Sequence, residues 1–264
     1  MEIRGEQLQI AYGDYIAVAD MDIHVRKGMI TSIIGPNGSG KSTVLKGLTR
    51  LLGYTSGAVY LDNRSLKDFS AKELARHIGV LPQIHSAPPD FQVKELVGYG
   101  RMPYQKWYEH NSTEDKKIVD WAMKATGVYG LREKSINQCS GGEKQRVWIA
   151  TVLTQQPEIL FLDEPTTYLD VSHQLETMRL VKKLNQENHM AILFIGVVMV
   201  LHDLSQAMEV SDWIVVIKEG RKYAEGAPMD VITPKMMKEV YDVECDIVTI
   251  PGREKPLIAY KEIC

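Results

Sequence analysis

Several features that mark other classes of protein are scarce or missing in this sequence. Only three of its 264 residues are cysteine, Cys139, Cys245 and Cys264, and their spacing matches no metal site. A few unpatterned cysteines favour reduced thiols in the cytosol over a disulfide framework. The net charge of −3 gives no electrostatic reason to expect nucleic acid as a partner, because such binding usually demands a basic face.

Long apolar segments are missing as well. The longest apolar run, Ala191–Leu201, has 11 residues, whereas a membrane-spanning helix needs roughly 20. The first residues, Met1–Glu6, lack the apolar core of a signal peptide. We therefore expect a chain that does not cross a membrane by itself. The charged fraction of 25% and the hydrophobic fraction of 44% are ordinary for a soluble domain with a substantial core.

The most informative stretch follows Met29–Ile34, a short β-branched run typical of a buried parallel strand. The stretch fits the phosphate-loop pattern G-x-x-x-x-G-K-[ST], and apolar residues then recur at helical spacing from Ser42 to Leu52. The matching residues are Gly35, Pro36, Asn37, Gly38, Ser39, Gly40, Lys41 and Ser42. An ordinary glycine-rich turn would explain the glycines but not the Lys-Ser pair behind them.

These residue types suit the binding of phosphate. The glycines let the backbone curl so that its N–H groups point at phosphate oxygens, and the start of the following helix reinforces them. Lys41 would add a positive charge for the β- and γ-phosphates, and the Ser42 hydroxyl is a natural Mg²⁺ ligand. The sequence therefore predicts a protein that binds a nucleoside triphosphate.

A second apolar strand, Glu158–Leu162, ends in two acids, Asp163 and Glu164. An acid at the tip of a buried strand is costly unless it binds something. We expect Asp163 to serve Mg²⁺ and Glu164 to face the γ-phosphate as general base. Gln83 follows the strand Ile78–Leu81 and either reaches Mg²⁺ or the attacking water, or is an ordinary loop glutamine; both interpretations stay open.

Three weaker candidates accompany these groups. Ser140, Gly141 and Gly142 precede a helix and would form a second bed of N–H donors, although Ser-Gly-Gly is also a common loop. His202 follows a strand at a point where it could contact a γ-phosphate, although a lone histidine is more often a surface or packed residue. Tyr12 either packs at a strand end or stacks on an adenine ring, with nothing to separate the two.

The middle of the chain shows a different pattern of predicted secondary structure. From Pro88 to Gln138 the helical segments Val93–Gly98 and Glu114–Thr126 occur without any strand signal, and Pro103–Tyr108 looks like an exposed aromatic cluster. We predict an α/β fold, a P-loop NTPase core with a parallel sheet. It would carry an N-terminal antiparallel β subdomain and an inserted α-helical subdomain.

Taken in order, these residues resemble the ATPase subunits of ABC transporters over essentially the whole chain. The resemblance implies a single domain at 1–264 with its helical subdomain at about 88–150, and ATP and Mg²⁺ as cofactors. It assigns Tyr12 as adenine platform, Gly35–Ser42 as Walker A, Gln83 as Q-loop, Ser140–Glu143 as signature, Asp163-Glu164 as Walker B, Leu169-Asp170 as D-loop and His202 as switch histidine.

The site residues that we expect fall into three groups. The catalytic group is Glu164, His202, Gln83 and Lys41. The nucleotide-binding group is Tyr12, Gly35, Pro36, Asn37, Gly38, Ser39, Gly40, Lys41, Ser42, Thr43, Ser140, Gly141, Gly142 and Asp170. The Mg²⁺ ligands are Ser42, Gln83 and Asp163.

Narrower features look like the importers of iron–siderophore complexes, haem and cobalamin. These are Gly100–Tyr104, Gln145–Ala150, Pro165–Asp170 with His173-Gln174, and Val200–Leu204. Iron chelates are the most common cargo of that group, so we expect an ATPase that powers iron-chelate import. The implied partners are a second copy of the chain, two membrane permease subunits and, indirectly, an extracytoplasmic binding protein, with no nucleic acid. The implied location is cytoplasmic, peripheral on the inner face of the cell membrane.

The sequence departs from this family at two places. Cys139 stands where the signature usually begins with leucine, and we expect a modest effect on helix seating because cysteine is small and apolar. The span from Glu164 to His202 is a handful of residues longer than in the relatives, with the excess within Ile192–Gly196. Either these residues bulge out before the strand, or the strand register changes and displaces His202.

Two other classes of ABC ATPase fit less well. The DNA-repair type needs a long coiled coil between phosphate loop and signature, where only about a hundred residues lie. The ribosomal type carries two ATPase units in one chain. A third alternative stays open: the chain binds ATP but does not hydrolyse it, if the extra residues misplace His202.

Overall fold

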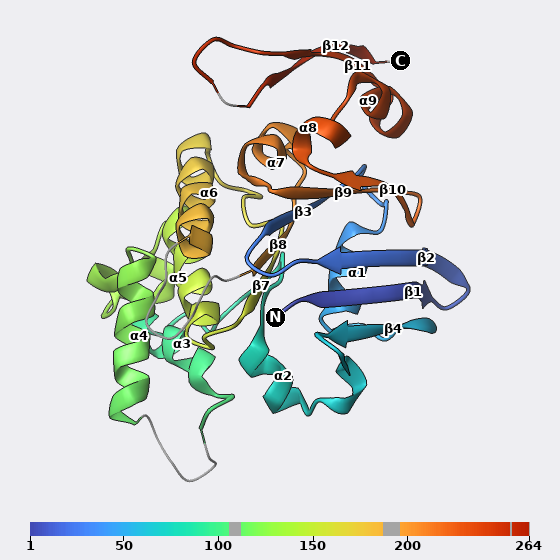
Figure 1. The fold of residues 1–264 in the computed structure, drawn as a ribbon. Coiled ribbons are helices and arrows are strands. Elements are labelled where there is room, and N and C mark those ends of the chain that lie inside the picture. Colours follow the sequence, from blue (N-terminus) through green and yellow to red (C-terminus); the bar gives the residue numbers. More distant parts are fainter. Residues whose placement is uncertain (106–111, 187–195, 254, 264) are drawn as a thin grey trace. The chain divides into compact units, whose positions relative to one another are not determined.

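The computed structural model describes residues 1–105, 112–186, 196–253 and 255–263 (Figure 1). The chain divides into two compact units. Unit 1 comprises Met1–Leu66 with Gly196–Cys264, and unit 2 comprises Lys67–Ile195. Unit 1 carries the phosphate loop, and unit 2 carries the acidic pair and the Ser-Gly-Gly segment. A single domain with a helical subdomain at about 88–150 stays a prediction.

Unit 1 begins with an antiparallel sheet in the order β2-β1-β4-β5. Its strands are β1 (Ile3–Tyr12), β2 (Tyr15–Val25), β4 (Ser56–Leu61) and β5 (Arg64–Ser65). Burial alternates along β1 on each side of a register shift between Gly5 and Leu8, as a strand with one covered face requires. A tight turn at Gly13-Asp14 joins β1 to β2, so that Tyr12 lies opposite Tyr15. The predicted N-terminal antiparallel sheet is therefore confirmed.

The second sheet of unit 1 is mainly parallel. Its order is β10 (Arg221–Gly226), β9 (Trp213–Lys218), β3 (Ile30–Ile34) and β8 (Gly196–Val200). β3 pairs in parallel with both β8 and β9, and all five residues of β3 and of β8 are buried. This burial on both faces explains the continuous apolar runs in the sequence.

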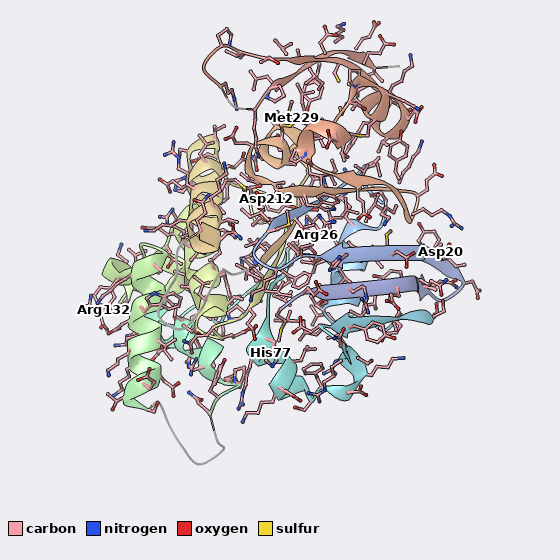
Figure 2. The ribbon with its side chains drawn as sticks, viewed as in Figure 1. Asp20, Arg26, His77, Arg132, Asp212 and Met229 are labelled. Atoms are coloured by element: carbon pink, nitrogen blue, oxygen red, sulfur yellow. The ribbon has the colours of Figure 1, made fainter. Side chains whose placement is uncertain are left out.

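Two charged side chains support the sheets of unit 1, one between the two sheets and one within the parallel sheet (Figure 2). The Arg26 guanidinium, just after β2, lies 4.0 Å from the centre of the Trp213 ring. Asp212 Oδ2 accepts a hydrogen bond from the backbone N–H of Ile30 at 2.8 Å. Both contacts lie at the start of β3 or β9, at the opposite strand end from the phosphate loop.

The helices of unit 1 differ from expectation in two respects. Helix α1 (Lys41–Leu48) ends before the predicted Leu52, because Thr49 caps it and Arg50 takes a left-handed φ of 59°. A helix after His202 was not predicted. The remaining elements are α7 (Leu204–Val210), α8 (Pro228–Val231), α9 (Pro234–Tyr241) and the hairpin of β11 (Val243–Val248) and β12 (Leu257–Ile263).

Unit 2 is built on two parallel strands, β6 (Ile78–Leu81) and β7 (Ile159–Asp163). Its helices are α2 (Ala71–His77), α3 (Val93–Gly98), α4 (Thr113–Ala125), α5 (Gly141–Leu153) and α6 (Val171–Gln186), with short turns η2 (Tyr99–Arg101), η3 (Tyr129–Leu131) and η4 (Ile136–Gln138). Among the described residues of 88–138 there is no strand, only one isolated bridge between Gln92 and Ser135. The predicted all-helical stretch is confirmed.

A buried ion pair anchors this helical region. Arg101 Nε donates to Asp115 Oδ1 at 2.7 Å, and the two side chains are 6% and 11% exposed. The Arg101 guanidinium also covers the ring of Tyr104 at 3.9 Å, and the Tyr104 hydroxyl donates to Gln155 O at 2.8 Å. The expectation that Pro103–Tyr108 is an exposed aromatic cluster is therefore wrong for Tyr104, which is half-buried. Trp107 and Tyr108 lie outside the described residues.

The long strand expected at Ala191–Leu201 is described only from Gly196, where β8 begins. The expected insertion at Ile192–Gly196 lies outside the described residues apart from Gly196 itself. From Val197 onward β8 pairs with β3 in an unbroken parallel register that ends with Val200 opposite Ile33. In the part of the chain that the structure describes, no helix combines the length and the apolar character that a membrane span requires.

Candidate nucleotide site

The phosphate loop, Gly35–Ser42, connects β3 to α1, as its sequence surroundings predict. Gly35 has a φ of 153°, and a Cβ atom at this position would lie 2.1 Å from the carbonyl oxygen of Ile217. Since that oxygen belongs to the backbone of β9, a larger residue could be accommodated only by displacing the loop or the strand. Only glycine fits there.

Three features of the loop suit an anion. The N-cap of α1, Gly40, makes no side-chain cap hydrogen bond, and the first turn of the helix carries no acid. Lys41 is buried, and its Nζ donates to the carbonyl oxygens of Gly35 at 2.9 Å and Pro36 at 2.8 Å, which keep the ammonium inside the loop. Ser39 Oγ is buried without a hydrogen-bond partner. An orphaned hydroxyl beside N–H donors fits a phosphate oxygen as acceptor.

Neighbouring segments of unit 1 hold the loop in shape. The N–H of Gly220, in the β9–β10 turn, donates to Ser39 O at 3.0 Å, and Gly220 O accepts from Ala19 N at 2.9 Å. The backbone of Gly35 forms a hydrogen bond with the phenol of Tyr241 at the end of α9, and burial raises the pKa of this phenol. Neither Gly220 nor Tyr241 was expected at the site, because no motif marks either of them.

Unit 1 also positions the two outlying candidates. Tyr12 is half-exposed at the end of β1, with its hydroxyl 3.5 Å from Thr43 Oγ1 in α1. His202 is exposed and follows β8 by two residues, and the N–H of Leu201 donates to Ile33 O at 3.2 Å. His202 and the phosphate loop therefore follow the carboxyl ends of two adjacent parallel strands, β8 and β3. This edge is where such sheets usually bind ligands.

In unit 2 the acidic pair ends β7. Asp163 is the last strand residue and is buried, whereas Glu164 has a left-handed φ of 52°, which is rare outside glycine. Gln83 Nε2 donates to Glu164 Oε2 at 2.6 Å, and Thr167 Oγ1 donates to the same oxygen at 3.0 Å. The structure thus brings Gln83 and Glu164 together, and two donors fix the orientation of the carboxylate.

The signature segment, Ser140–Glu143, starts α5 with a capping box. Ser140 Oγ accepts from Glu143 N at 3.3 Å, and Glu143 Oε2 accepts from Ser140 N at 2.7 Å. The hydrogen bond from the Ser140 backbone holds the pKa of the Glu143 carboxyl below its ordinary value. The Ser140 side chain also hydrogen-bonds to this carboxylate, and the N–H groups of Gly141 and Gly142 follow in the first turn of α5. Cys139 is buried, which raises its thiol pKa and fits the packing role expected of it.

The D-loop residue Asp170 caps the start of α6. Its Oδ1 accepts from the backbone N–H of His173 at 2.9 Å, from His173 Nδ1 at 2.7 Å and from Ser172 Oγ at 2.9 Å. The backbone donor and then the two side-chain donors lower the pKa of the Asp170 carboxyl to about 2. A contact between Asp170 and a nucleotide stays a prediction. His173 was noted in the sequence only as part of a subfamily pattern.

Comparison with known proteins identifies the family. The sequence matches the ABC transporter family over residues 18–167. It is 44% identical to the iron(3+)-hydroxamate import ATP-binding protein FhuC of Bacillus subtilis (strain 168), over 96% of this chain and 92% of that protein. It is 40% identical to the ferric enterobactin transport ATP-binding protein FepC of Escherichia coli (strain K12), over 97% of this chain and 93% of that protein.

A solved structure agrees with this identification. The fold matches the dimeric, post-hydrolysis structure of the ATP-binding cassette MJ0796 bound to ADP and Pi. The TM-score is 0.72 at 30% identity, and the match covers 86% of this chain and 98% of that one. Together with the phosphate loop and the acidic pair described above, these matches show that the chain belongs to the ABC transporter family and is one of its ATP-binding, ATP-hydrolysing subunits.

Proposed function

We propose that this chain hydrolyses Mg²⁺-bound ATP to drive an importer of iron(III)–siderophore or related iron chelates. The ATPase part follows from the family. The cargo part is supported by the two relatives above, whose names refer to ferric hydroxamate and ferric enterobactin. The observation that carries the link between hydrolysis and transport is the 2.6 Å hydrogen bond from Gln83 to Glu164. Gln83 opens the segment that leads into the helical region, so this bond joins that region to the catalytic carboxylate of the proposal.

The residues available for Mg²⁺ have the right chemistry. The Ser42 hydroxyl, the Asp163 carboxylate and the Gln83 amide oxygen are hard oxygen donors, which Mg²⁺ prefers. The described residues contain no cluster of three or more His, Cys, Asp or Glu suited to a metal. That fits an ion that takes most of its ligands from substrate phosphates and water. When bound, the ion would neutralise charge on the phosphates.

Our proposal gives each of the chain's own groups a task. Lys41 offsets charge on the β- and γ-phosphates, and the first turn of α1 binds them through its N–H groups. Glu164 orients and deprotonates the attacking water, with Gln83 and Thr167 fixing one of its carboxylate oxygens. His202 contacts the γ-phosphate, and Tyr12 stacks on the adenine.

The complete site needs a second copy of the chain. Gly141 and Gly142 offer N–H groups in the first turn of α5, beside the Ser140 hydroxyl, and this helix start would bind the γ-phosphate held by the partner copy. A two-fold dimer makes the arrangement reciprocal, so that two nucleotides are enclosed between two chains. The dimeric MJ0796 structure supports this assembly.

A groove in the helical region offers a docking surface for a membrane permease. It has a volume of about 880 Å³ and lies between α3, η2, α4 and η3 of unit 2. Its apolar lining includes Phe91, Tyr99, Met102, Val119 and Met123. Phe91 and Tyr99 stack with ring centroids 5.5 Å apart.

Charged side chains surround this groove. Lys94 and Glu133 form an ion pair at 2.6 Å, and the guanidinium of Arg132 lies 4.6 Å from the centre of the Tyr129 ring (Figure 2). A groove lined by both apolar and charged side chains suits one short amphipathic helix laid into it. We assign this helix to a cytoplasmic loop of the permease, which would hold the ATPase at the inner face of the cell membrane.

The first experiment tests hydrolysis and dimer formation together. Glu164→Gln should reduce turnover by roughly a thousandfold, because it removes the general base. It should leave ATP binding intact and trap an ATP-bound dimer that sedimentation can detect. If the variant hydrolysed ATP at the wild-type rate, the assignment of the base would be wrong. ATP binding without turnover in the wild type would leave the chain a nucleotide-binding module only.

The second experiment tests docking and cargo. Met102→Glu should weaken binding to the permease pair, since Met102 lines the groove and is 60% exposed. Leu51→Glu, at a residue of unit 1 that is 61% exposed, is the matched control. Transport of radiolabelled ferric hydroxamate across vesicles that contain the assembled transporter should require ATP on the side of the membrane where the ATPase subunits lie. Equal binding by both variants would contradict the docking site, and uptake of another chelate alone would contradict the cargo.

A further inference from the structure

His173, at the start of α6, contacts both the D-loop and the signature helix, and none of the ATPase roles above uses it. We propose that His173 is a positioning residue that sets the separation between the signature segment and the D-loop. The inference rests on the proposed function, in which both segments of one copy face the nucleotide of its partner.

The first contact fixes the D-loop. Since Asp170 is ionised above a pKa of about 2, it can only accept, so the Nδ1–H of His173 donates to Asp170 Oδ1 at 2.7 Å. Gln174, the next residue, donates from Nε2 to Leu169 O at 2.9 Å. Two successive side chains of α6 thereby hold the two residues of the D-loop.

The second contact fixes the signature helix. A Cβ atom added to Gly142 would lie 1.7 Å from Cδ2 of the His173 ring and 2.6 Å from its Nε2. The imidazole therefore packs directly on the Cα of Gly142, the second residue of α5. This contact explains why Gly142 must be glycine, although its backbone takes no left-handed φ.

A further pair supports the same arrangement one turn along each helix. Arg146 of α5 donates to Glu176 of α6 at 2.6 Å. The imidazole is also well placed to act as a spacer, since its side chain is only 29% exposed. A rigid planar ring between Gly142 and Asp170 transmits any shift of one segment to the other. The D-loop and the signature segment therefore move as one body.

The two contacts can be separated by substitution. His173→Phe keeps a ring against Gly142 and loses the donor to Asp170, whereas His173→Gln keeps a donor and loses the ring. His173→Ala loses both contacts. In a Glu164→Gln background we expect His173→Ala to weaken ATP-driven dimerisation by at least about tenfold. Binding of a fluorescent ATP analogue to the single subunit should stay within about twofold of the parent, because unit 1 carries the phosphate loop.

A double substitution tests the ring contact. Gly142→Ala should weaken dimerisation strongly, because its methyl group collides with the His173 ring. In the His173→Ala background the same change should cost far less, since the ring is gone. This non-additivity is the sign of a direct contact. In the catalytically competent protein, His173→Ala should lower kcat while leaving the KM for ATP nearly unchanged.

His77 supplies the matched control. It is 29% exposed, like His173, and its Nδ1 lies 2.8 Å from the carboxylate of Glu158, at the opposite end of β7 from the acidic pair. His77→Ala should leave dimerisation unchanged. If Glu164→Gln alone failed to dimerise with ATP, the proposed function would fail. If it dimerised and His173→Ala matched it, or if the effects of Gly142→Ala and His173→Ala simply added, the inference about His173 alone would be overturned.

Discussion

The two units of this chain hold the glycines of their candidate anion sites in different ways. In unit 1, a Cβ on Gly35 would meet the backbone carbonyl of Ile217 at 2.1 Å. In unit 2, a Cβ on Gly142 would meet the side chain of His173 at 1.7 Å. The phosphate loop is thus shaped by backbone packed on backbone, and the signature segment by a replaceable imidazole.

This difference bears on how each region can respond to a ligand. A loop fixed by main-chain contacts from β9, the β9–β10 turn and the residues around Ala19 is a rigid cradle for phosphate. The signature segment packs on the His173 side chain, which is itself hydrogen-bonded to Asp170, so this segment can adjust together with the D-loop. Rigid binding in one unit and concerted adjustment in the other suit the proposed function, in which one copy binds ATP and then closes on a second copy.

The largest effect should come from Gly35→Ala. The added methyl group meets backbone that no side-chain change can move, so we expect nucleotide affinity to fall by at least about a hundredfold. Equilibrium binding of an ATP analogue would measure it. Gly53→Ala is the control, because a Cβ at Gly53 meets nothing within 4 Å. Restoration of binding by any single side-chain truncation in unit 1 would contradict the contrast with Gly142.

The next largest effect should be on the stability of unit 2. Arg101→Ala leaves the carboxylate of Asp115 buried without its cation, so we expect a loss of about 3–5 kcal/mol in the free energy of unfolding. Lys94→Ala breaks an exposed ion pair of similar length, 2.6 Å, and should cost less than about 1 kcal/mol. Denaturant titration measures both. Equal losses would mean that the buried pair does not anchor the helical region.

A smaller effect is expected at the carboxylate of Glu164. Gln83→Leu removes the shorter of the two hydrogen bonds described above, at 2.6 Å, and should lower turnover by about tenfold while ATP binding persists. Thr167→Val removes the longer donor, at 3.0 Å, and should lower turnover less. Steady-state kinetics separates them. A larger loss in Thr167→Val than in Gln83→Leu would contradict this order.

The smallest effect should be the pH dependence that arises from Asp170. Its pKa is lowered in the folded protein from 3.8 to about 2, so its helix-capping contribution is present above pH 3.8 and is lost as the pH falls toward 2. The group is exposed, and salt should weaken the effect further. Asp170→Asn should flatten this part of the acid-unfolding profile. A variant whose acid unfolding equals that of the wild type down to pH 2 would contradict the assignment.

Much of the fold is readable from the sequence because its cause is local. The β-branched run before Gly35 predicts a buried strand, and the phosphate-loop pattern predicts the turn and helix behind it. The end of α1 was missed because a left-handed Arg50 stops it, and arginine gives no such signal. The burial of Tyr104 was missed because it depends on Arg101, whose partner Asp115 lies 14 residues further along the chain.

The residues of the candidate site likewise fall into those that the sequence predicts and those that only the fold identifies. The motif residues of unit 1 can be recognised because phosphate binding by backbone demands glycines at fixed spacing. Tyr241 and His173 could not be assigned roles, since a tyrosine at a helix end and a histidine on a helix fit many environments. Only the fold brings Tyr241 to Gly35 and His173 to Gly142.

The central claim, that each ATP site is shared between two chains, can be tested by mixing variants. Lys41→Ala disables a phosphate loop, and Ser140→Ala weakens a signature segment. An equal mixture of the two single variants should recover about a quarter of wild-type turnover, because half of the dimers are mixed and each mixed dimer has one intact site. In a second mixture, a chain that carries both substitutions is combined with the wild type. This mixture should show no turnover beyond that of the wild-type dimers. Recovery in the second mixture and none in the first would show that each site lies within one chain, and would contradict the account.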